Sequence, residues 1–184
     1  MDYLNYFHVN SKVILTYFLI SLIMLLLKNL TNKRSNKWFS SGRGGVLNIM
    51  TYIKMITHIF IHNNYNHFRN NFLYILLIGP MIEEKYGSIN LIKMIIITSI
   101  ITSLINIIIS KKNIMGASGI VYMLILLSSL VNIEAGKIPI TLILIFFFYI
   151  ITEIKDGLFK RDNISHLSHI IGAISGFIFG YYIF

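Results

Sequence analysis

The amino-acid sequence predicts an all-α membrane protein, a bundle of six transmembrane helices. Of its 184 residues, 55% are hydrophobic and only 12% are charged, whereas about a quarter of the residues in a water-soluble domain carry a charge. The apolar residues fall in long runs, and a helix needs roughly 20 of them to cross a bilayer. Helices are expected because every backbone polar group needs a partner where lipid replaces water.

Six apolar ranges meet this length or come close to it. In chain order they are residues 13–28, 64–83, 90–110, 115–133, 138–154 and 164–184. The first and fifth are short, so charged residues at their ends would have to reach the membrane surface. Pro139 suits the opening turn of the fifth helix. No repeat or linker divides the chain, so we expect one domain over residues 1–184.

The first apolar run, from Val13 to Leu27, also has the length of a signal-peptide core. Lys28, Lys33 and Arg34 follow it, and no cleavage motif of small residues is present. We therefore interpret this run as a retained membrane anchor. Residues 29–63 are polar at first and then mixed, which predicts a long connection to the second helix.

Polar residues gather at the starts of the second, fourth and sixth helices, and polar residues inside membrane helices are often functional. His58 and His62 lead into the second helix, which carries His67, Arg69, Asn70 and Asn71. The fourth carries Gly116, Ala117, Ser118 and Gly119, and the sixth carries His166, His169, Gly172, Gly176 and Gly180. Since successive spans alternate in direction, these three helices run the same way. We therefore expect the three groups to lie at one depth in the membrane.

The spacing within these groups predicts which side chains share a helix face. His67 and Asn71 are four residues apart, so they can direct two donors at one point. His169 shares a face with the glycines that follow it, and such small residues let a neighbouring backbone approach closely. If that neighbour is the helix that begins near Ser118, His169 comes within hydrogen-bond reach of the Ser118 hydroxyl.

A serine beside a base and near two donors is the arrangement that acyl transfer requires. A serine hydroxyl is a weak nucleophile until a base takes its proton, and the tetrahedral intermediate needs donors for its oxyanion. His67, Asn71 and the backbone N–H of Ser118 can supply them, helped by the dipoles of helix N-termini. Asp162 is the sole carboxylate near either partner in the sequence. We therefore expect a Ser118–His169 dyad without an acidic third member.

Four motifs, in chain order, resemble the rhomboid family of intramembrane serine proteases. They are THIFIHNNYNHFRNN before and within the second helix, GPMIEEKYGS at the turn after it, GASGIVYML at the fourth helix and SHIIGAISGFIFG at the sixth. Glu83 and Gly87 stand in the matching places of the turn. A GxSG motif alone is weak evidence, but four motifs at the expected helix ends are specific. Together they span about residues 52–184.

The resemblance implies cleavage of single-pass membrane proteins in or near their transmembrane helix, with no cofactor and no metal ion. It implies Ser118 as nucleophile, His169 as base, and His67 and Asn71 as oxyanion donors. It also implies supporting positions, including an aromatic residue that packs on the catalytic histidine; these are Gly116, Gly119, Tyr122, Gly172 and Gly176.

Other interpretations stay open. His166, three residues before His169, is a competing base. The pairs His58/His62 and His166/His169 have spacings typical of metal ligands, which would suit a metal-dependent membrane enzyme. A catalytically silent rhomboid-like protein that binds membrane clients would keep the same fold. The roles of His58, His62 and Arg69 are not determined by the sequence.

The net charge of +9 does not indicate nucleic-acid binding, because the basic residues cluster between apolar runs. Contact with anionic lipid headgroups explains them better. We expect a multi-pass protein of a bacterial-type plasma membrane, whose partners are the lipid bilayer and single-pass substrates. The loops on the side of the active site hold most of the Lys and Arg residues, so the positive-inside rule predicts an active site that opens to the cytoplasm. In bacterial relatives with six helices, by contrast, the active site usually opens to the outside of the cell. Orientation, natural substrate and oligomeric state therefore stay open.

Overall fold

The computed structural model describes residues 10–31, 34–44, 48–110, 112–131, 133, 137–159 and 165–183. Within these ranges every regular element is a helix, apart from one isolated antiparallel bridge between Ser41 and Ile114. The prediction of an all-α fold is confirmed. The carboxylate Asp162, which the sequence places near His169, lies outside the described residues.

Each of the six predicted ranges contains a helix. The elements are α1 (Lys12–Leu30), α4 (Tyr65–Tyr86), α5 (Ser88–Ile109), α6 (Ser118–Ser128), α7 (Ile140–Ile145) with α8 (Ile151–Phe159), and α9 (His166–Ile178). A π-helical turn, Phe146–Ile150, joins α7 to α8, and another, Phe179–Ile183, extends α9. Among the described residues, α5 is the one helix whose length and apolar composition suffice to cross a membrane. The count of six spans stays a prediction.

The long connection between the first two predicted helices is folded. It contains α2 (Arg34–Phe39), α3 (Ile49–Thr57) and a 3-10 turn at His58–Phe60. The Asn48 side chain begins α3 by accepting a hydrogen bond from the Met50 N–H at 2.9 Å, as capping asparagines do. The backbone of Ser41 forms hydrogen bonds with that of Ile114. This connection is therefore fixed to the irregular segment that leads into α6.

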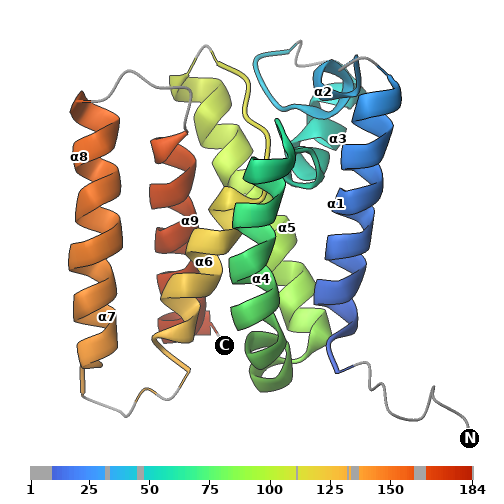
Figure 1. The fold of residues 1–184 in the computed structure, drawn as a ribbon. Helices are drawn as coiled ribbons and strands as arrows, with labels where there is room; N and C mark the ends of the chain where they lie inside the picture. The colour runs from blue at the N-terminus through green and yellow to red at the C-terminus, as the bar shows by residue number, and fades with distance from the viewer. Residues whose placement is uncertain are drawn as a thin grey trace, which may run out of the picture.

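Helices α4, α6 and α9 run in the same direction, from the upper toward the lower end of the bundle in Figure 1. Helices α1, α5 and the α7–α8 pair run the opposite way. The polar groups at the starts of α4, α6 and α9 therefore lie toward one end of the bundle, as the alternation of spans predicted.

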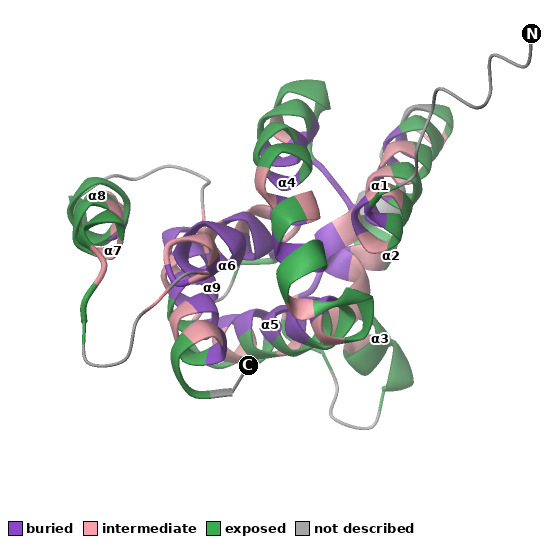
Figure 2. Cartoon of the chain, turned by 90° about the horizontal axis from the view of Figure 1, so that it is seen from below, coloured by how far each residue is buried: buried purple, intermediate pink, exposed green. Residues whose placement is uncertain are grey.

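Helix α6 lies at the centre of the bundle and is largely buried, with α4, α5 and α9 in contact with it (Figure 2). The α7–α8 pair stands at the margin (Figure 2). Between this pair and the bundle is an apolar hollow of about 400 Å³. It is lined by Leu126, Leu142, Ile143, Phe146, Ile150, Ala173, Ile174 and Phe177.

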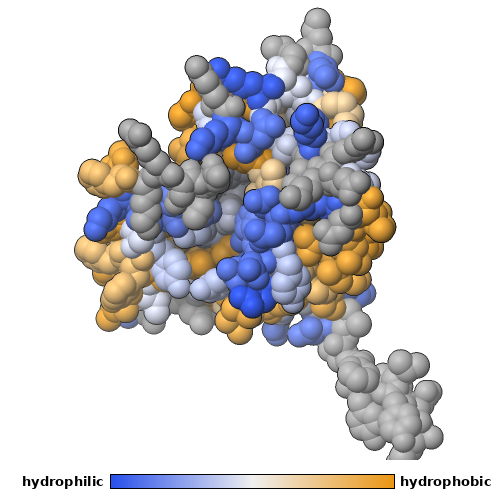
Figure 3. Space-filling view, turned by 45° about the horizontal axis from the view of Figure 1, so that its top comes forward, coloured by the Kyte–Doolittle hydropathy of each residue, from blue (hydrophilic) through white to orange (hydrophobic). Residues whose placement is uncertain are grey.

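The outer faces of the helices expose large apolar side chains, as a surface that meets lipid requires. Leu77 of α4 and Phe148 beside α7 are exposed by 75% and 71%. Figure 3 shows hydrophilic residues gathered in the middle of the face turned forward, with hydrophobic residues along its flanks. This division matches a bundle whose sides face lipid and whose upper end meets water.

Glycines allow the close contact between α6 and α9. A Cβ atom on Gly172 would lie 2.0 Å from the carbonyl oxygen of Gly119, and one on Gly176 would lie 2.2 Å from that of Met123. Such distances are far below van der Waals contact, so the two backbones touch directly. The predicted packing of the glycine face of the sixth helix on the fourth is confirmed.

Glu83, near the end of α4, ties that helix to the beginning of α1. Its carboxylate accepts hydrogen bonds from the backbone N–H of Val13 at 3.1 Å and of Ile14 at 3.2 Å. It also accepts one from the Ser88 hydroxyl at 2.7 Å. The first N–H groups of a helix have no partner within it, so this carboxylate caps α1. Gly87 makes the turn to α5 with a φ of +81°.

Candidate functional site

Ser118 is the first residue of α6, and hydrogen bonds hold the chain just before it. Gly116 has a φ of +110°, a conformation that favours glycine. The N–H of Gly116 donates to the His58 carbonyl oxygen at 2.9 Å, and the N–H of Ala117 donates to His62 Nε2 at 3.3 Å. The serine is therefore held at the N-terminal, positive end of the α6 dipole.

His58 and His62, whose roles the sequence left open, both contact the segment that carries the serine. His58 is buried, its Nδ1 lies 3.2 Å from the Lys54 carbonyl oxygen, and burial lowers the pKa of His58 to about 4. Its imidazole is therefore neutral at pH 7. His62 packs edge to face against His67, with ring centroids 5.2 Å apart. These contacts explain the two histidines as supports of the site.

His169 lies one turn into α9 and faces α6. Its imidazole stacks on the ring of Tyr122, with centroids 4.4 Å apart and an angle of 8° between the planes. Tyr122 is one turn after Ser118 on α6, and Gly172, one turn after His169, contacts the Gly119 backbone. The base and the serine predicted from the sequence therefore lie on touching helices, at the same level of the bundle. The stacking that the resemblance implied is present.

His67 and Asn71, the predicted oxyanion donors, lie one turn apart on α4. The Asn64 side chain accepts from the His67 N–H at 2.8 Å and so begins the helix. The His67 ring lies against Gly116, because a Cβ atom there would be 2.6 Å from His67 Cε1. Asn71 is buried, and its Nδ2 has no hydrogen-bond partner among the described residues. A buried amide donor without a partner is rare in proteins.

A carboxylate other than Asp162 lies beside the predicted base, although the sequence predicted a Ser118–His169 dyad without an acidic third member. Glu153 Oε2 of α8 is 2.9 Å from His169 Nδ1, an ion-pair distance, although the angle is not that of a hydrogen bond. The Tyr122 hydroxyl donates to Glu153 Oε1. The physical reason is the topology: α8 and α9 are antiparallel, so Gly157 lies beside His166, and Glu153, one turn earlier on α8, lies beside His169, one turn later on α9.

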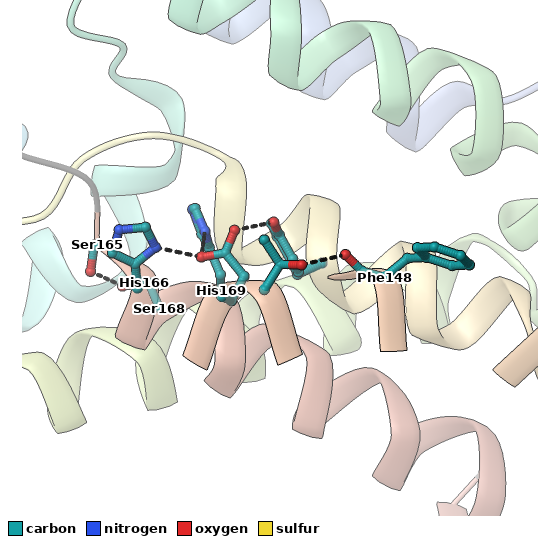
Figure 4. A network of polar contacts seen from close by, with 8 residues as sticks. Phe148, Ser165, His166, Ser168 and His169 are labelled. Atoms are coloured by element: carbon teal, nitrogen blue, oxygen red, sulfur yellow. Dashed lines mark hydrogen bonds and ion pairs between the residues drawn. The ribbon is translucent and has the colours of Figure 1, made fainter. Parts of the chain in front are cut away.

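His166, the competing base, is engaged with the same carboxylate. Its Nδ1 lies 2.6 Å from Glu153 Oε2, and its ring centroid is 6.1 Å from that of His169 (Figure 4). The ring is buried one turn before His169 on α9. Ser165 and Ser168 are hydrogen-bonded to each other beside it, at 2.7 Å (Figure 4). His166 thus belongs to the surroundings of His169.

The family of this chain follows from comparison with known proteins. Residues 49–184 match the family model of the Rhomboid domain. The chain belongs to the rhomboid family. It is 24% identical over 146 residues to Rhomboid-like protein 11, chloroplastic, from Arabidopsis thaliana, which covers 71% of this chain and 52% of the relative. It is 29% identical over 140 residues to Rhomboid-related protein 1 from Caenorhabditis elegans, which covers 70% of this chain and 39% of the relative. This chain therefore matches about half or less of each relative's length.

In this rhomboid, the groups predicted from the sequence are distributed over α4, α6 and α9, as the motifs indicated. Arg69, which lies between His67 and Asn71 in the sequence, is exposed, and its guanidinium donates to the Asn70 side chain at 3.4 Å. Among the described residues, this exposed contact is the one found for the Arg69 side chain, and it involves neither His67 nor Asn71.

Sequence reasoning missed Glu153, although a signal for it existed. A charged residue inside an apolar range faces the protein interior more often than lipid, and Glu153 is the acidic residue at the end of range 138–154. Glu153 is not a sequence neighbour of Ser118 or His169. It lies instead on the preceding helix, 16 positions before His169 in the chain.

The same carboxylate completes one group of possible metal ligands. Ligand atoms of Glu153, His166 and His169 lie within 4.8 Å of one another. Two imidazoles and a carboxylate form a ligand set that zinc accepts. Of the two histidine pairs with ligand spacing, His166/His169 is in this cluster, whereas His62 is bonded to the Ala117 N–H through its Nε2.

Proposed function

We propose that this rhomboid is an intramembrane serine endopeptidase, with Ser118 as the nucleophile and His169 as the general base. The observation that carries the proposal is the contact of α9 with α6, in which His169 stacks on Tyr122 one turn after Ser118. Ser118 attacks the carbonyl carbon of a peptide bond while His169 takes the hydroxyl proton. His169 then gives this proton to the leaving amine.

The negative charge of the tetrahedral intermediate would be met by donors from two helices. The unpartnered Nδ2 of Asn71 and the ring of His67 against Gly116 support this role. The N–H of Ser118, at the first position of α6, is a third donor with no partner inside its helix. Donors fixed before the reaction stabilise the oxyanion without reorganisation.

The proposed substrates are single-pass membrane proteins, cut in or near their transmembrane helix. Rhomboid membership and the exposed apolar faces support a site reached from within a bilayer. We further propose a multi-pass arrangement of the six helices, with α5 as the best-supported span. A bacterial-type plasma membrane stays a prediction, since one of the relatives is named as chloroplastic.

The test is cleavage of a model single-pass substrate co-reconstituted in liposomes. Wild type is expected to release a fragment whose new terminus maps to the membrane segment or its edge, and Ser118→Ala and His169→Ala are expected to release none. Ser128→Ala, at the other end of α6, is the matched control and should retain activity. Absence of cleavage by folded wild type would favour the catalytically silent, client-binding rhomboid.

A metal-dependent membrane enzyme is the second candidate, favoured by the clustering of Glu153, His166 and His169. Under this proposal a zinc-type ion would activate water, and Ser118 would not react. Activity that is lost on chelation and survives Ser118→Ala would support it. Activity that resists chelation and is lost in Ser118→Ala would exclude it.

A further inference from the structure

We propose that Glu153 is a positioning residue for His169, so that the catalytic group of this chain is a Ser118–His169–Glu153 triad. The inference rests on the proposed function and extends it to a residue on α8. Glu153 Oε2 lies 2.9 Å from His169 Nδ1, with the two side chains exposed by only 12% and 10%. A carboxylate and an imidazole this close and this buried interact strongly, since little water screens them.

The carboxylate is held from two helices besides its own. The Tyr122 hydroxyl of α6 donates to Oε1, and His166 Nδ1 of α9 lies 2.6 Å from Oε2. A buried charge is costly unless it is paired and hydrogen-bonded, and these contacts meet that need. Tyr122 thus has two functions, because its ring stacks on His169 while its hydroxyl fixes the acid.

The contact selects the tautomer that the reaction needs. A proton on Nδ1 of His169 faces the carboxylate, which leaves Nε2 without a proton and able to accept one from Ser118. When His169 takes that proton, the adjacent negative charge stabilises the imidazolium. In the resting structure the contact has ion-pair distance without hydrogen-bond angle. Catalytic hydrogen bonds often align only when substrate is bound.

The experiment measures the second-order rate constant at which a fluorophosphonate probe labels Ser118 at neutral pH, in purified full-length protein. Glu153→Gln keeps the volume of the side chain and removes its charge, Glu153→Asp keeps the charge, and Glu84→Gln changes an exposed glutamate as the matched control. Metal chelator is present throughout, so that an adventitious ion at the cluster cannot alter the rates.

We expect Glu153→Gln to label about 10²-fold more slowly at neutral pH, within the range that an oriented acid–base group contributes. Glu153→Asp should recover part of the rate, and Glu84→Gln should match wild type. The other titratable groups around His169 are Tyr122, His166 and His67, and these variants retain all three residues.

A purely structural role for Glu153 would reduce the amount of active protein and leave the second-order rate constant of the folded fraction unchanged. Labelling of Glu153→Gln at the wild-type rate would overturn the triad and leave the dyad standing. If folded wild-type protein is not labelled, Ser118 is not an activated nucleophile, and both the proposed dyad and the proposed triad are wrong. If the Glu153 variants do not fold, Tyr122→Phe carries the test, since it removes a donor to the carboxylate and keeps the ring. It should label about 2- to 10-fold more slowly, and an unchanged rate would overturn the inference.

Discussion

The Tyr122 ring lies flat against the His169 imidazole, with centroids 4.4 Å apart and planes within 8° of parallel. One side chain of α6 thereby fixes the orientation of the proposed base on α9. Because Tyr122 is one turn from Ser118, the stack also sets the height of the imidazole relative to the nucleophile. Aromatic stacking of this kind contributes about 0.5–1.5 kcal/mol beyond burial.

Removing the stack should therefore slow the reaction more than removing the hydroxyl alone. Tyr122→Leu is expected to cleave a model substrate roughly 10- to 100-fold more slowly than wild type, since it loses both the ring and the hydrogen bond. Tyr122→Phe keeps the ring and should retain more activity. Initial cleavage rates in liposomes measure the difference. Equal rates for the two variants would mean that the ring does not orient His169.

The backbone contact between α6 and α9 makes Gly172 sensitive to a single added carbon. A Cβ atom there would meet the Gly119 carbonyl oxygen at 2.0 Å, and backbone cannot move aside as a side chain can. Gly172→Ala should destabilise the fold by about 1–3 kcal/mol and abolish most activity. Gly180→Ala is the matched control, because its nearest neighbour is the side-chain tip of Leu130 at 2.9 Å. Thermal unfolding in detergent should rank Gly172→Ala as the less stable variant, and the reverse ranking would contradict the packing.

Asn71 tests the oxyanion proposal, since its amide donor has no partner among the described residues. Asn71→Ala should lower kcat by about 10²–10³-fold with little change in KM, because the donor acts on charge that forms during the reaction. Asn70→Ala, an exposed neighbour on the same helix, should behave as wild type. An increase in KM with unchanged kcat would instead assign Asn71 to substrate binding.

Glu83 provides a test of stability that is independent of catalysis. Its carboxylate accepts from the N–H groups of Val13 and Ile14, which the Glu83→Ala substitution would leave without this partner. We expect a loss of about 2–3 kcal/mol, as for hydrogen bonds to charged groups. Glu84→Ala, at the exposed neighbouring position, should change the free energy of unfolding by less than about 0.5 kcal/mol. Equal effects of the two substitutions would show that Glu83 does not cap α1.

The principal helices could be predicted because apolar length is a strong signal, and α4, α5 and α1 follow it within a few residues. The predicted helix bounds are least accurate where a helix continues into polar sequence. The fifth range was ended at residue 154, yet α8 continues to Phe159, because a helix can carry Lys155 and Asp156 beyond an apolar stretch. The short helices α2 and α3 were missed since six and nine residues give too few turns for a periodic pattern, and packing stabilises them instead.

For the candidate site, residues within motifs could be predicted and a partner across helices could not. The motifs locate the starts of three helices, which carry His67, Ser118 and His169. Because successive helices alternate in direction, these three starts lie at the same end of the bundle. Glu153 belongs to no motif and approaches His169 only because α7 and α8 pack beside α9. Its contact with His169 depends on how α8 is rotated about its own axis. Packing against other helices sets this rotation, and the residues near Glu153 in the sequence do not reveal it.

The most direct test of the account is whether Ser118 is an activated nucleophile. Purified protein in detergent is treated with a fluorophosphonate probe, and the modified residue is identified by mass spectrometry. We predict a single adduct on Ser118 that disappears in Ser118→Ala and in His169→Ala, while Ser128→Ala is labelled as wild type. Folded wild type that carries no adduct on Ser118, or labelling that persists at Ser118 without His169, would contradict the proposed serine peptidase.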